Sequence, residues 1–136
     1  MIDNDLKIIS GAKYFLDRYL SLNSGTIYND YAASLSMMSL DLREQKLSEV
    51  KNTGYLARIE GAHSHSFNDY SKGRKKAAII AKQDLLAAVR LRGNMVVTPE
   101  NGETFERPFD ITLEINVVAR NTFVTAGIKI TNITGN

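Results

Sequence analysis

The two histidines of the chain lie in one short segment, where they can share a face. His63 and His65 are separated by a single serine. On an extended backbone both imidazoles can reach one metal ion, with Glu60 or Asp69 supplying a carboxylate. However, the chain has no third histidine, and a His-x-His pair arises easily by chance. We therefore predict no bound metal or cofactor and interpret both histidines as polar residues of an exposed loop.

The same segment offers the residue types of a serine hydrolase. Ser64 or Ser66 can act as the nucleophile, a histidine as the base and Asp69 as the orienting acid. Such triads usually assemble from distant segments, and the Gly-x-Ser-x-Gly elbow is absent. The lack of cysteine excludes thiolate catalysis, disulfides and cysteine-based metal sites. The sequence therefore predicts a protein that is not an enzyme.

A cluster of basic residues follows this segment. Seven Lys or Arg residues and one Asp lie between Lys72 and Arg92, although the net charge of the whole chain is only +2. The candidate anion-binding residues of segment 66–76 are the cations Lys72, Arg74, Lys75 and Lys76 and the aromatic residues Phe67 and Tyr70. Cations and free N–H groups at a helix start, with rings for stacking, suit nucleic acid or a nucleotide. The alternative is a solvated basic helix start, and the spacing is not that of a P-loop.

An acidic hairpin is expected downstream of the basic cluster. Glu100, Glu103 and Glu106 surround an Asn-Gly pair, which is a strong hairpin signal. Arg90 and Arg92 carry the opposite charge at the end of a predicted helix. Contact between the hairpin of one subunit and the basic helix of the next would set the register of a homo-oligomer. A neighbouring subunit would also cover the edge of the C-terminal sheet.

Helical periodicity predicts the elements that position these residues. Apolar residues recur three and four positions apart over 5–22 and again over 74–91. Gly93 is suited to cap the second of these helices. The segment 30–50 also favours a helix, although part of it alternates like a strand.

The C-terminal third changes to the period of a strand. Residues 111–117 and 124–131 alternate between apolar and polar, as expected for two antiparallel strands. Earlier in the chain, we expect a short strand over 55–59 and a loop over 61–73. The predicted fold class is α+β, with an antiparallel sheet of three to five strands packed against two or three helices. Because the length and the 43% hydrophobic content suit one core, we expect a single domain over 1–136.

The location of the protein is predicted from what the sequence lacks. No apolar run approaches the length of a membrane span, and the first five residues are acidic where a signal peptide would be basic. We therefore expect a cytoplasmic protein, or a virion protein if the chain is viral, with no membrane contact.

These features predict a non-enzymatic structural or assembly protein that forms a homo-oligomer and contacts other proteins. In the order of its elements alone, the chain is similar to head-to-tail connector and tail-completion proteins of tailed bacteriophages, which implies a place in a virion. The alternative function is a binding module for nucleic acid or a phosphorylated small molecule through segment 66–76.

Overall fold

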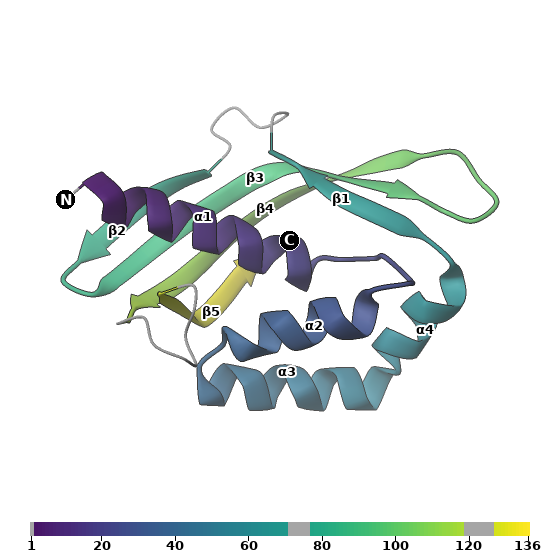
Figure 1. Ribbon diagram of the computed structural model, residues 1–136, viewed down its shortest axis with the longest axis horizontal. Helices are drawn as coiled ribbons and strands as arrows, with labels where there is room; N and C mark the ends of the chain where they lie inside the picture. The colour runs from purple at the N-terminus through teal and green to yellow at the C-terminus, as the bar shows by residue number, and fades with distance from the viewer. Residues whose placement is uncertain (1, 71–76, 119–126) are drawn as a thin grey trace.

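The chain folds into helices packed on an antiparallel sheet, as the computed structural model shows for residues 2–70, 77–118 and 127–136 (Figure 1). The helices in these ranges are α1 (Ile2–Tyr19), α2 (Ile27–Ser36), α3 (Leu40–Thr53) and α4 (Tyr55–Ala62). The strands are β1 (His65–Asp69), β2 (Ala77–Gln83), β3 (Leu86–Thr98), β4 (Phe105–Val117) and β5 (Ile128–Gly135). The predicted α+β fold class is confirmed.

The sheet is built around the long β3–β4 hairpin, whose tip extends beyond the helices (Figure 1). The strand order is β1-β3-β4-β5. Both β1 and β2 pair with the same edge of β3: β2 pairs with the first half of β3 and β1 with the second half. At the opposite edge, the α2–α3 connection bonds to β5. The N–H groups of Ser39 and Ile130 donate to the carbonyls of Ile130 and Met37, at 2.8 and 2.7 Å.

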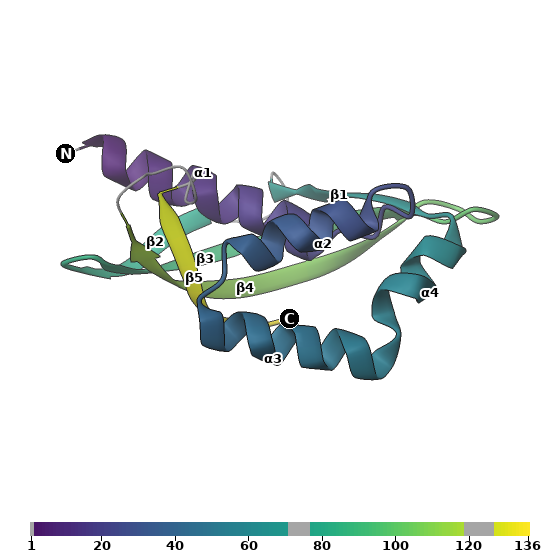
Figure 2. The ribbon, with the colours of Figure 1, turned by 60° about the horizontal axis from the view of Figure 1, so that its bottom comes forward.

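The hydrophobic core lies between α1 and the face of the sheet that α1 crosses (Figures 1 and 2). Buried and less buried residues alternate along β3 and along the second half of β4, as the predicted alternation of 111–117 requires. The fully buried side chains of α1 and the sheet include Ile8, Phe15, Leu16, Val89, Leu91, Leu113, Ile115, Ile128 and Ile130. Burial of each contributes roughly 1.5–3 kcal/mol relative to exposure.

The helix predicted over 74–91 is wrong, because residues 77–91 form the β2–β3 hairpin. Alanine and leucine at helical spacing suggested the helix, but the chain turns back after Gln83 with Asp84 at a φ of 54°. Once β3 is a strand, its apolar residues fall on one face with period two. Gly93 is not a helix cap: a side chain there would collide with the carbonyl oxygen of Asp69 on β1.

The middle of the chain is more helical than predicted. Residues 55–59 lie in α4, not in a strand, because Gly54 adopts a left-handed conformation that ends α3 and allows α4 to start at once. The helical prediction over 30–50 is confirmed for most of its residues, but as two helices, α2 and α3, with residues 37–39 between them. The helix predicted over 5–22 is confirmed as α1, which ends at Tyr19. The loop predicted over 61–73 contains β1. No helix in the described ranges is long and apolar enough to cross a membrane.

Candidate functional site

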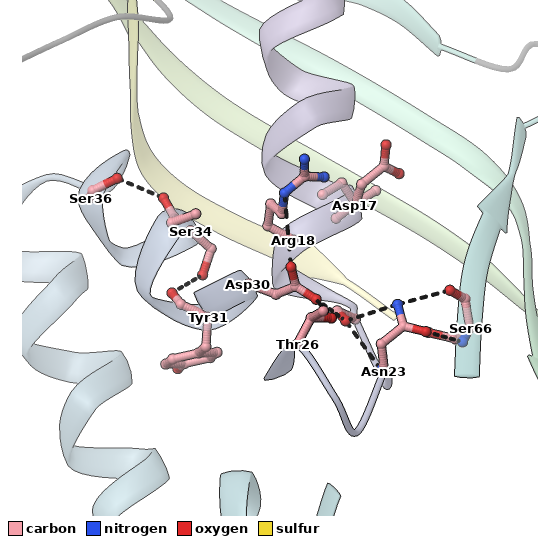
Figure 3. Close-up of polar contacts among 12 residues, drawn as sticks. Asp17, Arg18, Asn23, Thr26, Asp30, Tyr31, Ser34, Ser36 and Ser66 are labelled. Atoms are coloured by element: carbon pink, nitrogen blue, oxygen red, sulfur yellow. Dashed lines mark hydrogen bonds and ion pairs between the residues drawn. The ribbon is translucent and has the colours of Figure 1, made fainter. Parts of the chain in front are cut away.

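A polar pocket of about 290 Å³ lies where the end of α1, the α1–α2 connection and β1 meet (Figure 3). We call it the polar pocket, and its lining residues are Asp17, Arg18, Ser21, Asn23, Thr26, Asp30, Ser66, Phe67 and Asn68. One of them, Phe67, belongs to the anion-binding set predicted from the sequence. The pocket therefore joins segments that are more than forty residues apart.

Asp30 binds the α1–α2 connection to the first turn of α2. Its Oδ2 accepts hydrogen bonds from Ser21 Oγ at 2.6 Å and Thr26 Oγ1 at 2.8 Å. Its Oδ1 lies 4.0 Å from Nε of Arg18 (Figure 3). A carboxylate in the first turn of a helix is also stabilised by the helix dipole. The negative charge of Asp30 is thus balanced by groups of the chain itself.

Asn23 fastens the connection to β1. Its Oδ1 accepts from the backbone N–H of Ser66 at 2.7 Å, and its Nδ2 donates to the carbonyl of Ser66 at 3.0 Å. Ser66 Oγ in turn accepts from the N–H of Leu22 at 2.8 Å. The side-chain amide of Asn23 therefore satisfies backbone groups at the open edge of β1 as a neighbouring strand would.

The serines and histidines of the 63–66 segment do not form a catalytic triad. Ser64 Oγ donates to the carbonyl of Leu22 at 2.6 Å, and its N–H donates to Ser24 Oγ at 2.7 Å. His63 ends α4 with a φ of 51°, His65 starts β1, and both are exposed. Within residues 5–70, 77–118 and 127–136, no three His, Asp or Glu side chains gather in a way that could hold a metal ion.

Asp17 anchors the residues that follow β1. Its Oδ1 accepts from Asn68 Nδ2 at 3.0 Å and from the Tyr70 hydroxyl at 2.8 Å. Tyr70 packs edge-on against Phe109, with ring centroids 5.7 Å apart. Burial and the hydrogen bond to Asp17 raise the pKa of Tyr70 above its ordinary range. Tyr70 is therefore held half-buried against the core.

The structure separates the two aromatic residues of the predicted anion site. Phe67 pairs with Val96 and is 62% exposed, whereas Tyr70 packs toward α1. The predicted cations of that site, Lys72, Arg74, Lys75 and Lys76, lie outside the described residues. The residues that follow them, 77–83, form β2 and not the continuation of a helix.

The residues predicted to join subunits lie on β3, on β4 and at the hairpin tip. Arg90 donates two hydrogen bonds to Asp110, at 2.9 and 2.6 Å, and lowers the pKa of that carboxyl. Asn94 Nδ2 donates to Glu106 at 3.1 Å. Arg92 lies beside Arg90 on β3, and Glu100 and Glu103 are exposed near the hairpin tip. Because these arginines lie on a strand, the predicted contact between a hairpin and a basic helix is wrong.

A second pocket of about 370 Å³ was not predicted from the sequence. We call it the aromatic pocket, and it is lined by Tyr19, Leu20, Tyr31, Glu49, Val50, Thr53, Tyr55 and Arg58. Figure 3 shows the ring of Tyr31 pointing away from the polar cluster. These residues come from α1 and its end, α2, α3 and α4, and no spacing in the sequence relates them.

The fold is shared with proteins of type IV secretion systems, although no protein-family model and no curated protein match the sequence. An IcmL-like type IV secretion system protein from Legionella pneumophila superposes with a TM-score of 0.74 at 8% identity, covering 96% of this chain and 91% of that one. The periplasmic domain of DotI gives 0.68 at 14% identity, covering 95% and 92%. CagV from Helicobacter pylori, described as a VirB8 homolog, gives 0.68 at 11% identity, covering 96% and 97%.

These likenesses overturn the functions predicted from the sequence. The matched structures are secretion-system proteins, and none of the three is described as a viral connector or a nucleic-acid binder. The interpretations as a phage assembly protein and as a nucleic-acid or phosphate-binding module are therefore wrong. The cytoplasmic or virion location is also wrong, since one of the matched structures is a periplasmic domain.

Proposed function

We propose that this chain is a non-enzymatic component of a type IV secretion system that works in the periplasm by contacting other proteins. The observation that carries the proposal is the shared fold with three secretion-system proteins, which extends over nearly the whole chain. Fold likeness at this identity supports a function only by analogy, so features of the site must agree with it.

The polar pocket supports a structural role for its hydroxyl groups. Ser21 donates to Asp30, and Ser66 Oγ accepts from a backbone N–H, so each hydroxyl already serves the fold. Neither His63 nor His65 lines either pocket. A serine without a neighbouring imidazole to take up its proton is a poor nucleophile, which favours a protein that binds over one that catalyses.

Two measurements test the location and the role. In the bacterium that encodes the chain, a fusion to alkaline phosphatase, which is active only outside the cytoplasm, should be active. Deletion of the gene should abolish translocation of a secreted substrate, and the wild-type gene supplied in trans should restore it. An inactive fusion together with unchanged translocation would overturn the proposal.

The partners are tested by cross-linking in intact cells followed by mass spectrometry. The proposal expects cross-links to other proteins of the secretion system, and cross-links between copies would support self-association. Fractionation with the envelope, measured beside a cytoplasmic marker, serves as the control. A chain that stays in the cytoplasmic fraction without such cross-links would contradict the proposed role.

A further inference from the structure

The aromatic pocket has the size and lining of a site for a small apolar group. Its volume of about 370 Å³ lies toward the lower end of the roughly 300–1,000 Å³ typical of ligand pockets. Its walls carry the rings of Tyr19, Tyr31 and Tyr55 and the aliphatic side chains of Leu20 and Val50. A pocket of this size accepts one apolar side chain with its flanking backbone, not a long peptide.

The three tyrosine rings form a continuous wall. The ring centroids of Tyr19 and Tyr31 are 6.4 Å apart with planes 27° apart, and those of Tyr31 and Tyr55 are 6.3 Å apart and tilted by 56°. Tyr31 is only 4% exposed, so the middle of the wall is fixed by the fold. Burial, reinforced by the neighbouring tyrosines, raises the pKa of Tyr31 and Tyr55. Like ordinary tyrosine hydroxyls, theirs are uncharged at neutral pH and do not repel an anion.

One positively charged side chain at the aromatic pocket has no partner among the described residues. Lys46 Nζ lies 3.4 Å from Glu49 Oε2 and 5.7 Å from the ring centre of Tyr19, and its side chain is only 15% exposed. The charges of Lys46 and Glu49 therefore neutralise each other. The guanidinium of Arg58, exposed on α4, has no hydrogen bond or ion pair with any other residue that the structure describes. The pocket thus combines an aromatic wall with one uncompensated cation.

We propose that the aromatic pocket binds the C-terminal residue of a partner polypeptide, its apolar side chain against the tyrosine wall and its carboxylate on Arg58. A guanidinium matches a carboxylate with two parallel hydrogen bonds. In a C-terminal residue the side chain and the carboxylate leave the same carbon atom, so both reach one small pocket.

A site for a C-terminal carboxylate goes beyond the proposed function. Binding at this site can be measured with the purified chain alone. The probe is the peptide acetyl-Gly-Ser-Gly-Phe, titrated calorimetrically as the free acid and as the C-terminal amide. Both forms carry the aromatic side chain, and only the acid carries the carboxylate. The free acid should bind at least tenfold more tightly, which corresponds to about 1.4 kcal/mol.

N-acetylphenylalanine separates a polypeptide end from a small carboxylate. It has the same ring and carboxylate but lacks the flanking backbone of the tetrapeptide. The proposal expects it to bind more weakly than the tetrapeptide acid. Equal affinity would overturn the assignment to a polypeptide.

Arg58→Gln tests the carboxylate contact, and Lys51→Gln is its matched control. Lys51 is exposed on α3 and does not line the pocket, so its replacement removes the same charge elsewhere. Arg58→Gln should bind the acid and the amide equally, while Lys51→Gln should keep the tenfold preference. The proposal fails if the wild-type chain does not distinguish acid from amide, if it binds neither, or if Arg58→Gln keeps the preference.

Discussion

The polar pocket and the aromatic pocket share the end of α1 but use their polar groups in opposite ways. In the polar pocket, Asp17 and Asp30 accept hydrogen bonds from side chains of the chain itself, and Asn23 pairs with the backbone of β1. In the aromatic pocket, Arg58 has no such partner within the described residues. A closed hydrogen-bond network stabilises a fold, whereas an open charge beside an apolar wall can bind a partner. The polar pocket therefore positions β1, and the aromatic pocket is the surface offered to a ligand.

The largest expected effect comes from breaking the polar network at Asn23. Asn23→Ala removes both hydrogen bonds to the backbone of Ser66, and the free energy of unfolding should fall by about 2 kcal/mol. Chemical denaturation monitored by circular dichroism measures this change. Asn23→Asp keeps the acceptor for the N–H of Ser66 and should lose less.

If the polar pocket and the aromatic pocket act independently, Asn23→Ala must still bind the peptide at the aromatic pocket. Below the denaturation midpoint, Asn23→Ala should retain the tenfold preference for the peptide acid. Loss of that preference in the folded variant would show that the two pockets are one unit.

A smaller effect is expected from Tyr70→Phe, which removes the hydroxyl bonded to Asp17. The free energy of unfolding should fall by about 1 kcal/mol at neutral pH. The pKa of Tyr70 is raised in the folded chain, so the folded state keeps its proton while the unfolded state loses it near the ordinary value of 10.0. Its contribution is fully present below that value and is lost as pH rises above it. The variant should therefore lose less stability above pH 10 than the wild type, as denaturation at several pH values will show.

The smallest effect is expected on the open face of the sheet, at the pair of Arg90 and Asp110. Both side chains are more than 40% exposed, so solvent screens most of the attraction. The pKa of Asp110 is lowered from its ordinary 3.8 by its hydrogen bond to Arg90. Its contribution is present above that value and is lost as pH falls through the folded-state pKa. Asp110→Asn should shift the midpoint of acid unfolding slightly, and no shift would show that the pair contributes nothing.

The sequence alone predicts those elements whose pattern of apolar residues fits only one kind of secondary structure. The first helix and the alternating strand over 111–117 were predictable because each buries one face with a clear period. The β2–β3 hairpin was not, because Ala78, Ala81 and Leu85 also fit a helix, and the turn depends on a non-glycine residue, Asp84, at positive φ. Local propensity was overridden by pairing with β4.

Neither pocket could be predicted from the sequence, for two different reasons. The polar pocket depends on ordinary serines and asparagines that become partners only when β1 lies beside the α1–α2 connection. The aromatic pocket depends on Gly54, which lets α4 turn Tyr55 and Arg58 toward α2. A short apolar run after a glycine gives no signal that separates this helix from a strand.

The most direct test of a binding role for the aromatic pocket in secretion is complementation of the deletion strain with Arg58→Gln. Lys51→Gln is measured beside it, and immunoblotting confirms equal amounts of each variant. We predict that Arg58→Gln accumulates normally and fails to restore translocation, while Lys51→Gln restores it fully. Full translocation with Arg58→Gln would contradict this role.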